Sequence, residues 1–112
     1  MAKRISVHES KIARQDHADR WSKDLIGGAE VPAPSGFSIG IAEYHQPEFG
    51  ELQVHGDQEA LYVISGVGQV TVGGELIDVR PGSGVYVAPG AAHATRRTSG
   101  EPVRLIYAHG SV

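Results

Sequence analysis

The sequence predicts an all-β fold. Fifteen glycines and six prolines divide its 112 residues into short runs rich in valine, isoleucine and tyrosine. The runs recur about every ten residues, and several short strands at such a spacing are typical of a β-sandwich or a β-barrel. A chain of this length suffices for one domain with one modest core. We therefore expect a single all-β domain.

Turn residues separate most of the expected strands. The Gly73-Gly74 pair favours a tight hairpin turn, because glycine tolerates a positive φ. Further turns are expected at Arg80-Pro81-Gly82 and at Ala88-Pro89-Gly90. The expected strands are Ile5–Val7, Phe37–Tyr44, Glu51–His55, Ala60–Ser65, Gly68–Val72, Leu76–Val79, Gly84–Ala88, His93–Arg97 and Val103–Tyr107.

Residues 1–34 are expected to form an N-terminal arm, and residues 35–112 the domain proper. The start of the arm has two readings: Ser10 is a suitable N-cap for a short helix through Trp21, whereas Trp21–Ile26 can instead be a strand. The connector Val31–Gly36 contains two prolines, neither of which can donate to a β-ladder. The arm is a candidate for a strand or a contact offered to a partner subunit.

The net charge of −3 is distributed unevenly along the chain. Six of the ten lysines and arginines lie at or before Lys23, and nine acidic residues fall between Asp24 and Asp78, where no lysine or arginine occurs. The basic arm is either a solvated segment or one that pairs with an acidic partner subunit. A nucleic-acid surface is not expected, because the domain is not basic overall.

Composition also bears on location. The absence of cysteine excludes disulfides and thiolate metal sites, and it suits a reducing cytoplasm. The first residues lead into no apolar core of the kind found in signal peptides. No stretch approaches the roughly 18 apolar residues of a membrane span. A cytoplasmic protein without membrane contact is expected.

Residue types that bind metals occur in two segments that are far apart in the sequence. Alternate side chains of a strand share one face, so Gln53 and His55 are expected to point the same way. If Gly56–Gln58 form a turn, Glu59 returns toward them, and His93 arrives from a strand that is distant in sequence. Two imidazoles and one carboxylate form the facial triad of non-haem iron oxygenases, and they are also a catalytic zinc set.

The spacing of these residues resembles that of the cupin superfamily, small β-barrels of the jelly-roll type. The first cupin motif reads His-x-His, three or four residues, Glu, six residues, Gly. The chain matches it with Gln53, His55, Glu59 and Gly66, so that Gln53 replaces the first histidine. The resemblance implies a cupin-type jelly-roll barrel preceded by the N-terminal arm.

The second cupin motif also has a counterpart. It reads Gly, five residues, Pro-x-Gly, two residues, His, three residues, Asn. The chain matches it with Gly82, Ala88, Gly90, His93 and Arg97, so that alanine replaces the proline and arginine the asparagine. The two motifs and the stretch between them span about residues 50–97, and the barrel reading extends this to about residues 35–107.

By this resemblance, Gln53, His55, Glu59 and His93 take the four metal-ligand positions, and the cofactor is a divalent ion: iron, or else zinc, manganese or nickel. An amide oxygen is a weaker donor than an imidazole nitrogen. Gln53 therefore either binds loosely and gives way to substrate, or hydrogen-bonds a metal-bound water. The alternative is a site without metal, in which these side chains form a hydrogen-bonded cluster.

Other residues are candidates for the substrate site. Arg97 shares the strand parity of His93, so it either points into the barrel and binds a carboxylate or faces water at the strand end. His45 and His109 are candidate general acids or bases, because an imidazole titrates near neutrality, or else surface residues. Tyr44 and Tyr62 are candidates for substrate contact, with packing as the alternative.

The resemblance implies a metal-dependent enzyme acting on a small, possibly anionic molecule. The most concrete version is an iron-dependent dioxygenase held by His55, Glu59 and His93. An isomerase or epimerase is the second version, in which His45, His109 or a tyrosine moves the proton. The rival from another class is a non-catalytic module that binds a sugar or an organic acid. Small barrels of this family are often homodimers.

Overall fold

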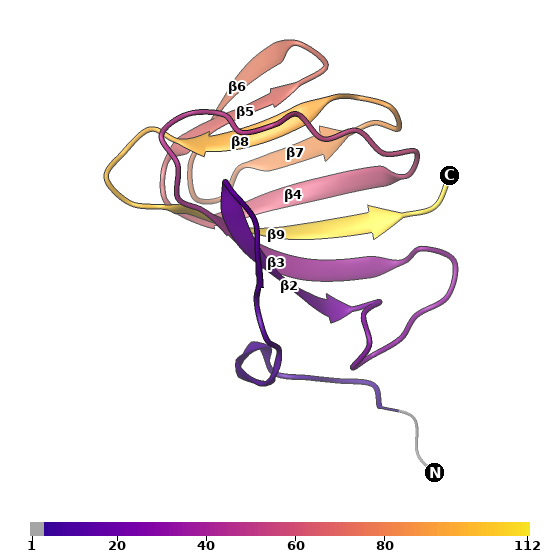
Figure 1. Ribbon diagram of the computed structural model, residues 1–112. Helices are drawn as coiled ribbons and strands as arrows, with labels where there is room; N and C mark the ends of the chain where they lie inside the picture. Colours follow the sequence, from indigo (N-terminus) through magenta and orange to yellow (C-terminus); the bar gives the residue numbers. More distant parts are fainter. Residues whose placement is uncertain (1–3) are drawn as a thin grey trace.

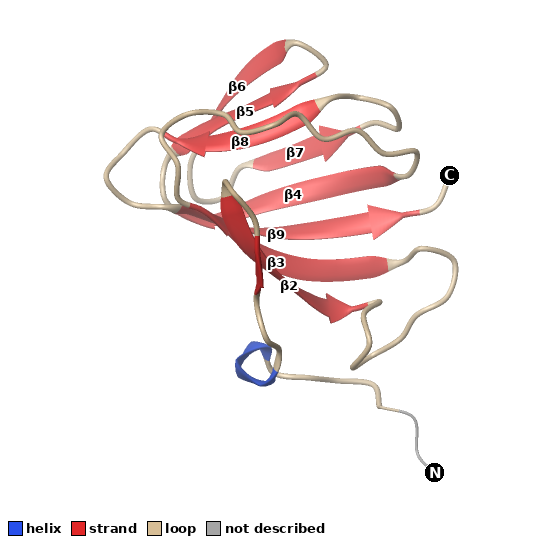
Figure 2. Cartoon of the chain, viewed as in Figure 1, coloured by secondary structure: helices blue, strands red, loops and turns tan. Residues whose placement is uncertain are grey.

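The computed structural model describes residues 4–112, so the first three residues of the predicted arm lie outside the described part. Strands dominate it, and its helical content is one short 3₁₀ segment, η1 (Figure 2). Within residues 4–112, no helix is long and apolar enough to span a bilayer. The elements are η1 Glu9–Lys11, β1 Gln15–Asp16, β2 Arg20–Ile26, β3 Ser38–Tyr44, β4 Gln58–Ser65, β5 Gly68–Val72, β6 Glu75–Val79, β7 Gly84–Val87, β8 His93–Arg97 and β9 Val103–Gly110.

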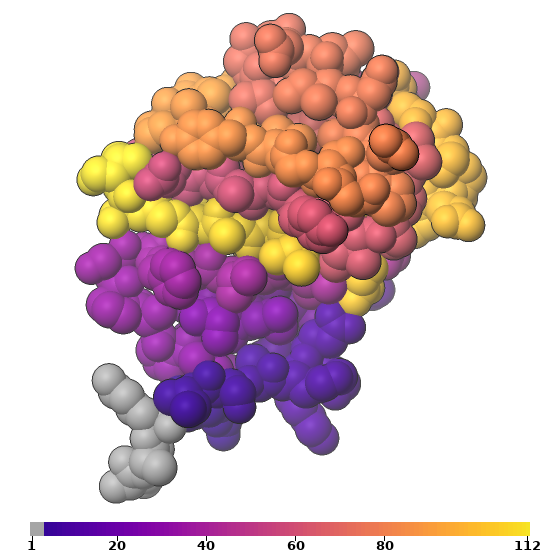
Figure 3. Space-filling model, turned by 180° about the vertical axis from the view of Figure 1, so that it is seen from behind, coloured from indigo at the N-terminus to yellow at the C-terminus, as the bar shows by residue number. Residues whose placement is uncertain are grey.

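The strands form two antiparallel sheets, a six-stranded one in the order β1-β2-β3-β9-β4-β7 and a three-stranded one in the order β6-β5-β8 (Figure 1). The last strand, β9, lies between β3 and β4, which the view from behind shows as yellow between purple and pink (Figure 3). Among residues 4–112, hydrogen bonds do not close the two sheets into one continuous barrel. The all-β jelly-roll fold expected from the sequence is confirmed.

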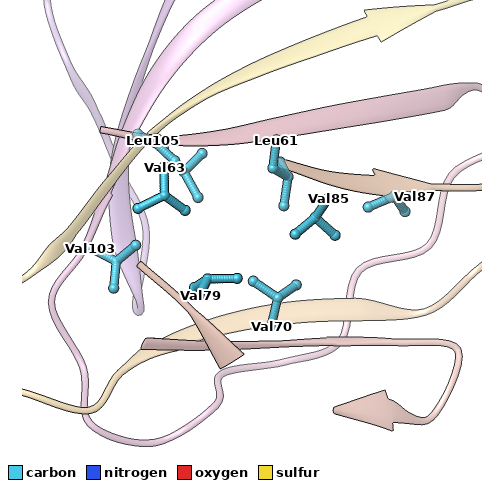
Figure 4. Packing of buried hydrophobic residues seen from close by; sticks show 9 residues of the cluster. Leu61, Val63, Val70, Val79, Val85, Val87, Val103 and Leu105 are labelled. Carbon is cyan, nitrogen blue, oxygen red and sulfur yellow. The ribbon is translucent and has the colours of Figure 1, made fainter. Parts of the chain in front are cut away.

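The apolar core lies between the two sheets (Figure 4). Strand β4 shows how it is built: Leu61 and Val63 are buried on one face, while Tyr62 on the other face is exposed. Glu59 has the same parity as Leu61 and is also buried. The buried cluster consists of Ala42, Leu61, Val63, Val70, Val79, Val85, Val87, Val103 and Leu105. The strand that supplies core residues therefore also places a carboxylate at the edge of the core.

The N-terminal segment corrects two expectations. The strand reading near Trp21 is right, because β2 pairs antiparallel with β3 in the six-stranded sheet. The expected strand at Ile5–Val7 is wrong, because these residues pair with no strand. Ile5 is 82% exposed, so this segment does not pack against the core. The helix reading shrinks to η1, which Glu9 holds against the sheet through Arg104 (Nη2 to Oε1 2.8 Å). The domain division at residue 34 stays a prediction.

The expected strand Glu51–His55 is also wrong. The chain leaves β3, runs beside β8 and then enters β4, and Gln53 forms an isolated β-bridge with His93 of β8 (Figure 1). Its amide donates to the His93 carbonyl at 2.9 Å and its carbonyl accepts from the His93 amide at 3.0 Å. The expected hairpin through Gly56–Gln58 does not form either, since the neighbours of β4 are β7 and β9. The hairpin turn at Gly73-Gly74 is confirmed, with φ of 57° and 86°.

Candidate metal centre

A polar cavity of about 220 Å³ lies beyond the end of the apolar core. Both sheets and the segment between β3 and β4 contribute to its walls, and most of the lining side chains are charged or can hydrogen-bond. They are Gln15, His17, Arg20, Ser22, Asp24, Tyr44, Gln53, His55, Glu59, His93, Tyr107 and His109. Such a lining favours a polar ligand.

The Glu59 carboxylate is the centre of a histidine cluster in this cavity. Its Oε1 lies 3.0 Å from Nε2 of His55 and 3.2 Å from Nε2 of His93. Its Oε2 lies 3.3 Å from Nε2 of His109. The structure thus brings together His55, Glu59 and His93, which the sequence motifs single out, and adds a third imidazole from β9.

Strand register brings His109 to Glu59, whereas His93 reaches it from the other sheet. Glu59 of β4 and His109 of β9 are direct cross-strand partners, so their side chains leave the sheet on the same face. His93 stands on β8 of the other sheet, and its Nδ1 is 3.0 Å from the Ala91 carbonyl oxygen. This carbonyl can only accept, so Nδ1 carries a proton, and Nε2 is the ring nitrogen that faces Glu59.

Asp57 lies behind two of the imidazoles. Its Oδ2 is 3.0 Å from Nδ1 of His109, and its Oδ1 is 2.5 Å from Nδ1 of His55. The second contact lacks the alignment of a hydrogen bond, so both of its atoms are buried polar atoms without a hydrogen-bond partner. One carboxylate therefore orients two rings whose Nε2 atoms face Glu59.

The cluster shifts the pKa values of its members. Burial acts to raise the pKa of the Glu59 carboxyl, but contacts with His93, His109 and His55 outweigh it and hold that pKa below its ordinary value. The hydrogen bond to Glu59 raises the pKa of His93, with burial opposing it. Slight burial acts to raise the pKa of Asp57, but its contacts with His109 and His55 outweigh this effect and lower that pKa. Glu59 and Asp57 are therefore ionised near neutral pH.

The donor set fits a divalent cation. Two ligands that bind one ion at ~2.1 Å and at right angles lie ~3 Å apart, close to the Nε2–Oε distances around Glu59. Donor atoms of His55, Glu59 and His109 all lie within 4.8 Å of one another. Imidazole and carboxylate suit iron, zinc, manganese and nickel. The residues present can therefore hold such an ion.

Gln53 and Tyr44, both named from the sequence, also line the cavity. With its oxygen facing the Arg20 guanidinium, the Gln53 carboxamide accepts hydrogen bonds from both Nη atoms of that side chain, at 2.8 and 2.9 Å. The Arg20 guanidinium lies 5.7 Å from the ring centroid of Tyr44. Burial raises the pKa of Tyr44 to about 12, so its hydroxyl keeps its proton at neutral pH.

The structure places three other sequence-derived candidates away from the cavity. Tyr62 is 53% exposed on the opposite face of the sheet. The Arg97 guanidinium donates to two backbone carbonyls, those of His45 at 3.0 Å and of Ser99 at 2.7 Å. His45 itself is exposed at the end of β3. None of the three lies among the residues that line the cavity.

Several cavity residues were not singled out from the sequence. Arg20, Ser22 and Asp24 alternate along β2 and all point into the cavity. Their parity was a usable signal once Trp21–Ile26 is taken as a strand. Asp57 does not line the cavity but contacts His55 and His109 from behind, and it carries no such signal, because it lies in the irregular segment before β4.

A family model for the cupin domain matches residues 40–109, which is more than half of the chain. The chain belongs to the cupin family. No curated protein sequence matches this cupin. Among solved structures it is similar to an RmlC-like cupin from Shewanella frigidimarina, with a TM-score of 0.78 and 15% identity over 98% of this chain and 93% of that one.

Two other similar structures are those of a predicted oxalate decarboxylase and of an oxalate decarboxylase. One is a predicted oxalate decarboxylase from Thermotoga maritima, with a TM-score of 0.82 and 15% identity over 96% of this cupin and 100% of that chain. The other is the enzyme from Lactobacillus farciminis, with a TM-score of 0.82 and 15% identity over 99% of this cupin and 34% of that chain. At these identities the likeness shows the fold.

Proposed function

We propose that this cupin is a metal-dependent enzyme that acts on a small organic acid. The observation that carries the proposal is the convergence of imidazoles on the buried Glu59 carboxylate inside a polar cavity. His55, Glu59 and His93 would hold the ion. Such an ion polarises a bound carbonyl or carboxylate, and iron adds oxygen chemistry.

Arg20 supports an anionic substrate. Its side chain is 14% exposed, and its guanidinium faces the cavity beside Gln53. Asp19 holds it from the other side, with Nη1 2.9 Å from Oδ1. A guanidinium fixed in this way matches a carboxylate through paired hydrogen bonds. Arg20 would orient the acid group of the substrate.

Two further features of the cavity fit this role. Its volume of about 220 Å³ is below the roughly 300–1,000 Å³ of sites for drug-sized ligands, which favours a small acid. Burial and the hydrogen bond to Asp24 raise the pKa of Tyr107. Its phenol therefore keeps its proton, which it donates to Asp24, and its oxygen can accept a hydrogen bond from a ligand at the cavity wall.

Within this class we propose dioxygenase-like oxidation as the leading reaction. The support is the combination of two imidazoles and one carboxylate with an acid-binding arginine, which leaves positions open for dioxygen and substrate. Decarboxylation of a small dicarboxylate is the activity in the names of the Thermotoga and Lactobacillus proteins, and it is tested alongside. Metal-dependent isomerisation and binding without catalysis are further outcomes of the same experiment.

The experiment uses the full chain purified without chelator, with its metal content measured by mass spectrometry. The protein is then incubated with a panel of 2-oxo acids, dicarboxylates and aromatic acids. Oxygen consumption and carbon dioxide release are recorded together, with Glu59→Gln as the inactive control. Oxygen uptake by iron-loaded protein supports the dioxygenase. Carbon dioxide release without net oxygen uptake, or isomer formation, replaces it with the corresponding alternative. A protein that binds no metal contradicts the proposal.

A further inference from the structure

We propose that His109 of β9, and not Gln53, supplies the fourth protein ligand of the metal centre. It completes the set formed by His55, Glu59 and His93. The inference rests on the proposed function in one respect, since it requires that the protein binds a metal. The family motif places this fourth ligand at position 53, before β4, whereas we assign it to β9.

Gln53 is committed to another partner. In the carboxamide orientation that satisfies both side chains, with the oxygen toward Arg20, it accepts two hydrogen bonds from the guanidinium, at 2.8 and 2.9 Å. Its backbone is fixed as well, because both its amide and its carbonyl are bonded to His93. The carboxamide cannot turn toward a metal without leaving a buried guanidinium short of two acceptors, which is costly. Gln53 therefore orients the Arg20 guanidinium.

His109 stands where a ligand is needed. The β4–β9 register pairs it with Glu59, and its Nε2 lies 3.3 Å from Oε2 of that carboxylate. Its ring centroid is 4.9 Å from that of His55. Strand β9 is hydrogen-bonded to β3 on one side and β4 on the other, so the backbone at His109 is held from both sides. The imidazole is part of the rigid wall of the cavity.

The tautomer of His109 is the one that coordination requires. Its Nδ1 contacts Asp57 Oδ2 at 3.0 Å, and an ionised carboxylate can only accept, so Nδ1 carries the proton. Nε2 is therefore the ring nitrogen left for coordination, on the side of Glu59, and a bound metal would displace any proton that it shares with that carboxylate. Metal-binding histidines commonly donate their second N–H to a carboxylate in this way. The other oxygen of Asp57 contacts Nδ1 of His55 without forming a hydrogen bond.

This ligand set determines where substrate would bind. The position that the first histidine of the motif would fill is occupied by Gln53, beside Arg20. With His109 as the fourth ligand, the cavity wall at Gln53 and Arg20 would be left for substrate. An acid bound there would contact the metal and the guanidinium together.

The direct test is nitrogen NMR of the histidine rings in the full-length protein, with zinc as the probe. On addition of one zinc per chain, the Nε2 signals of His55, His93 and His109 are expected to move to metal-bound positions. Zinc bound with the His109 Nε2 signal unmoved overturns the inference and leaves the proposed function standing. Failure to bind zinc at all overturns both.

Variants provide an independent readout through zinc affinity, measured by competition with a chromophoric chelator. His109→Gln is expected to weaken zinc binding by more than the roughly 10–100-fold that loss of an outer partner costs. Gln53→Ala is expected to retain zinc affinity, and so is His8→Gln, whose imidazole caps η1. Thermal unfolding of each variant shows whether it is folded. A folded His109→Gln variant that binds zinc as the wild type does, or a larger loss in Gln53→Ala, overturns the inference.

Discussion

The hydroxyl of Tyr107 on β9 donates to Asp24 on β2, 2.5 Å away, although β3 lies between these two strands. Gly40 of β3 is the register partner of both residues. A Cβ at position 40 would overlap the Cζ and Oη atoms of Tyr107. The missing side chain therefore lets the phenol ring cross β3 and form one wall of the cavity.

Gly40→Ala is expected to destabilise the protein by about 1–3 kcal/mol, the range for overpacking a close contact. Gly84→Ala is the matched control, since the nearest atom to its new Cβ is 4.0 Å away. That variant is expected to stay within about 0.5 kcal/mol of the wild type. Unfolding in denaturant measures both free energies. Equal effects at the two positions would show that Tyr107 does not depend on Gly40.

Substitutions of Arg20 and Arg97 are expected to differ in their effect on the affinity for small acids. Arg20→Gln is expected to weaken the affinity of the metal-loaded protein for a small dicarboxylate by about 1.5–3 kcal/mol, the range for hydrogen bonds to charged groups. Arg97→Gln is expected to leave that affinity unchanged, because its guanidinium is bonded to the carbonyls of His45 and Ser99. Isothermal titration calorimetry compares the two. A loss confined to Arg97→Gln would reassign the acid-binding group.

Asp57→Asn is expected to lower metal affinity about 10–100-fold, as loss of an outer-shell carboxylate does. The physical reason is that Asp57 contacts Nδ1 of both His55 and His109, and its hydrogen bond to His109 orients that ring. Asp78→Asn is the control, because that carboxylate is exposed on β6 and bonded to Gln69. Chelator competition gives both affinities, and equal values would remove Asp57 from the metal site.

The stability of the metal-free protein is expected to depend on pH on both sides of a plateau. The pKa of Glu59 is lowered in the fold, so its contribution is present above the ordinary value of 4.5 and is lost as pH falls through the lower folded value. The pKa of His93 is raised, so its contribution is present below 6.5 and is lost as pH rises through the higher folded value. The plateau lies between these limits.

Glu59→Gln tests this origin of the pH dependence, because the Glu59 hydrogen bond is the main cause of the His93 shift. Both limbs of the stability curve are expected to flatten in this variant. Thermal unfolding across the pH range, with metal removed, measures the effect. A variant with the wild-type pH profile would place the titrating groups elsewhere.

The sequence was sufficient for the fold and for much of the cavity. Motif spacing predicted that His55, Glu59 and His93 belong to one site, and the short runs between turn residues predicted most of the strands. Both are local patterns, readable from residue order. The strand reading of Glu51–His55 failed because the alternation of Gln53 and His55 reflects one bridge to β8 and not a ladder.

Other parts of the site depend on tertiary register. The parity of His109 was visible in the sequence, but its partner Glu59 follows only from the pairing of β4 with β9. Arg20 reaches the cavity because β2 adds to the sheet beside β3, and no short-range pattern specifies that neighbour. Arg97 has the parity of His93, yet it lies at the strand end, where backbone carbonyls compete for its guanidinium.

The central claim is that Glu59 and the surrounding imidazoles bind a divalent cation. Its most direct test is anomalous diffraction from crystals of the full chain grown with zinc or manganese, recorded at the absorption edge of the metal. The account predicts one strong peak at ~2.1 Å from a Glu59 oxygen and from the Nε2 atoms of His55 and His93. Crystals that contain the metal but show no peak between these residues would contradict it.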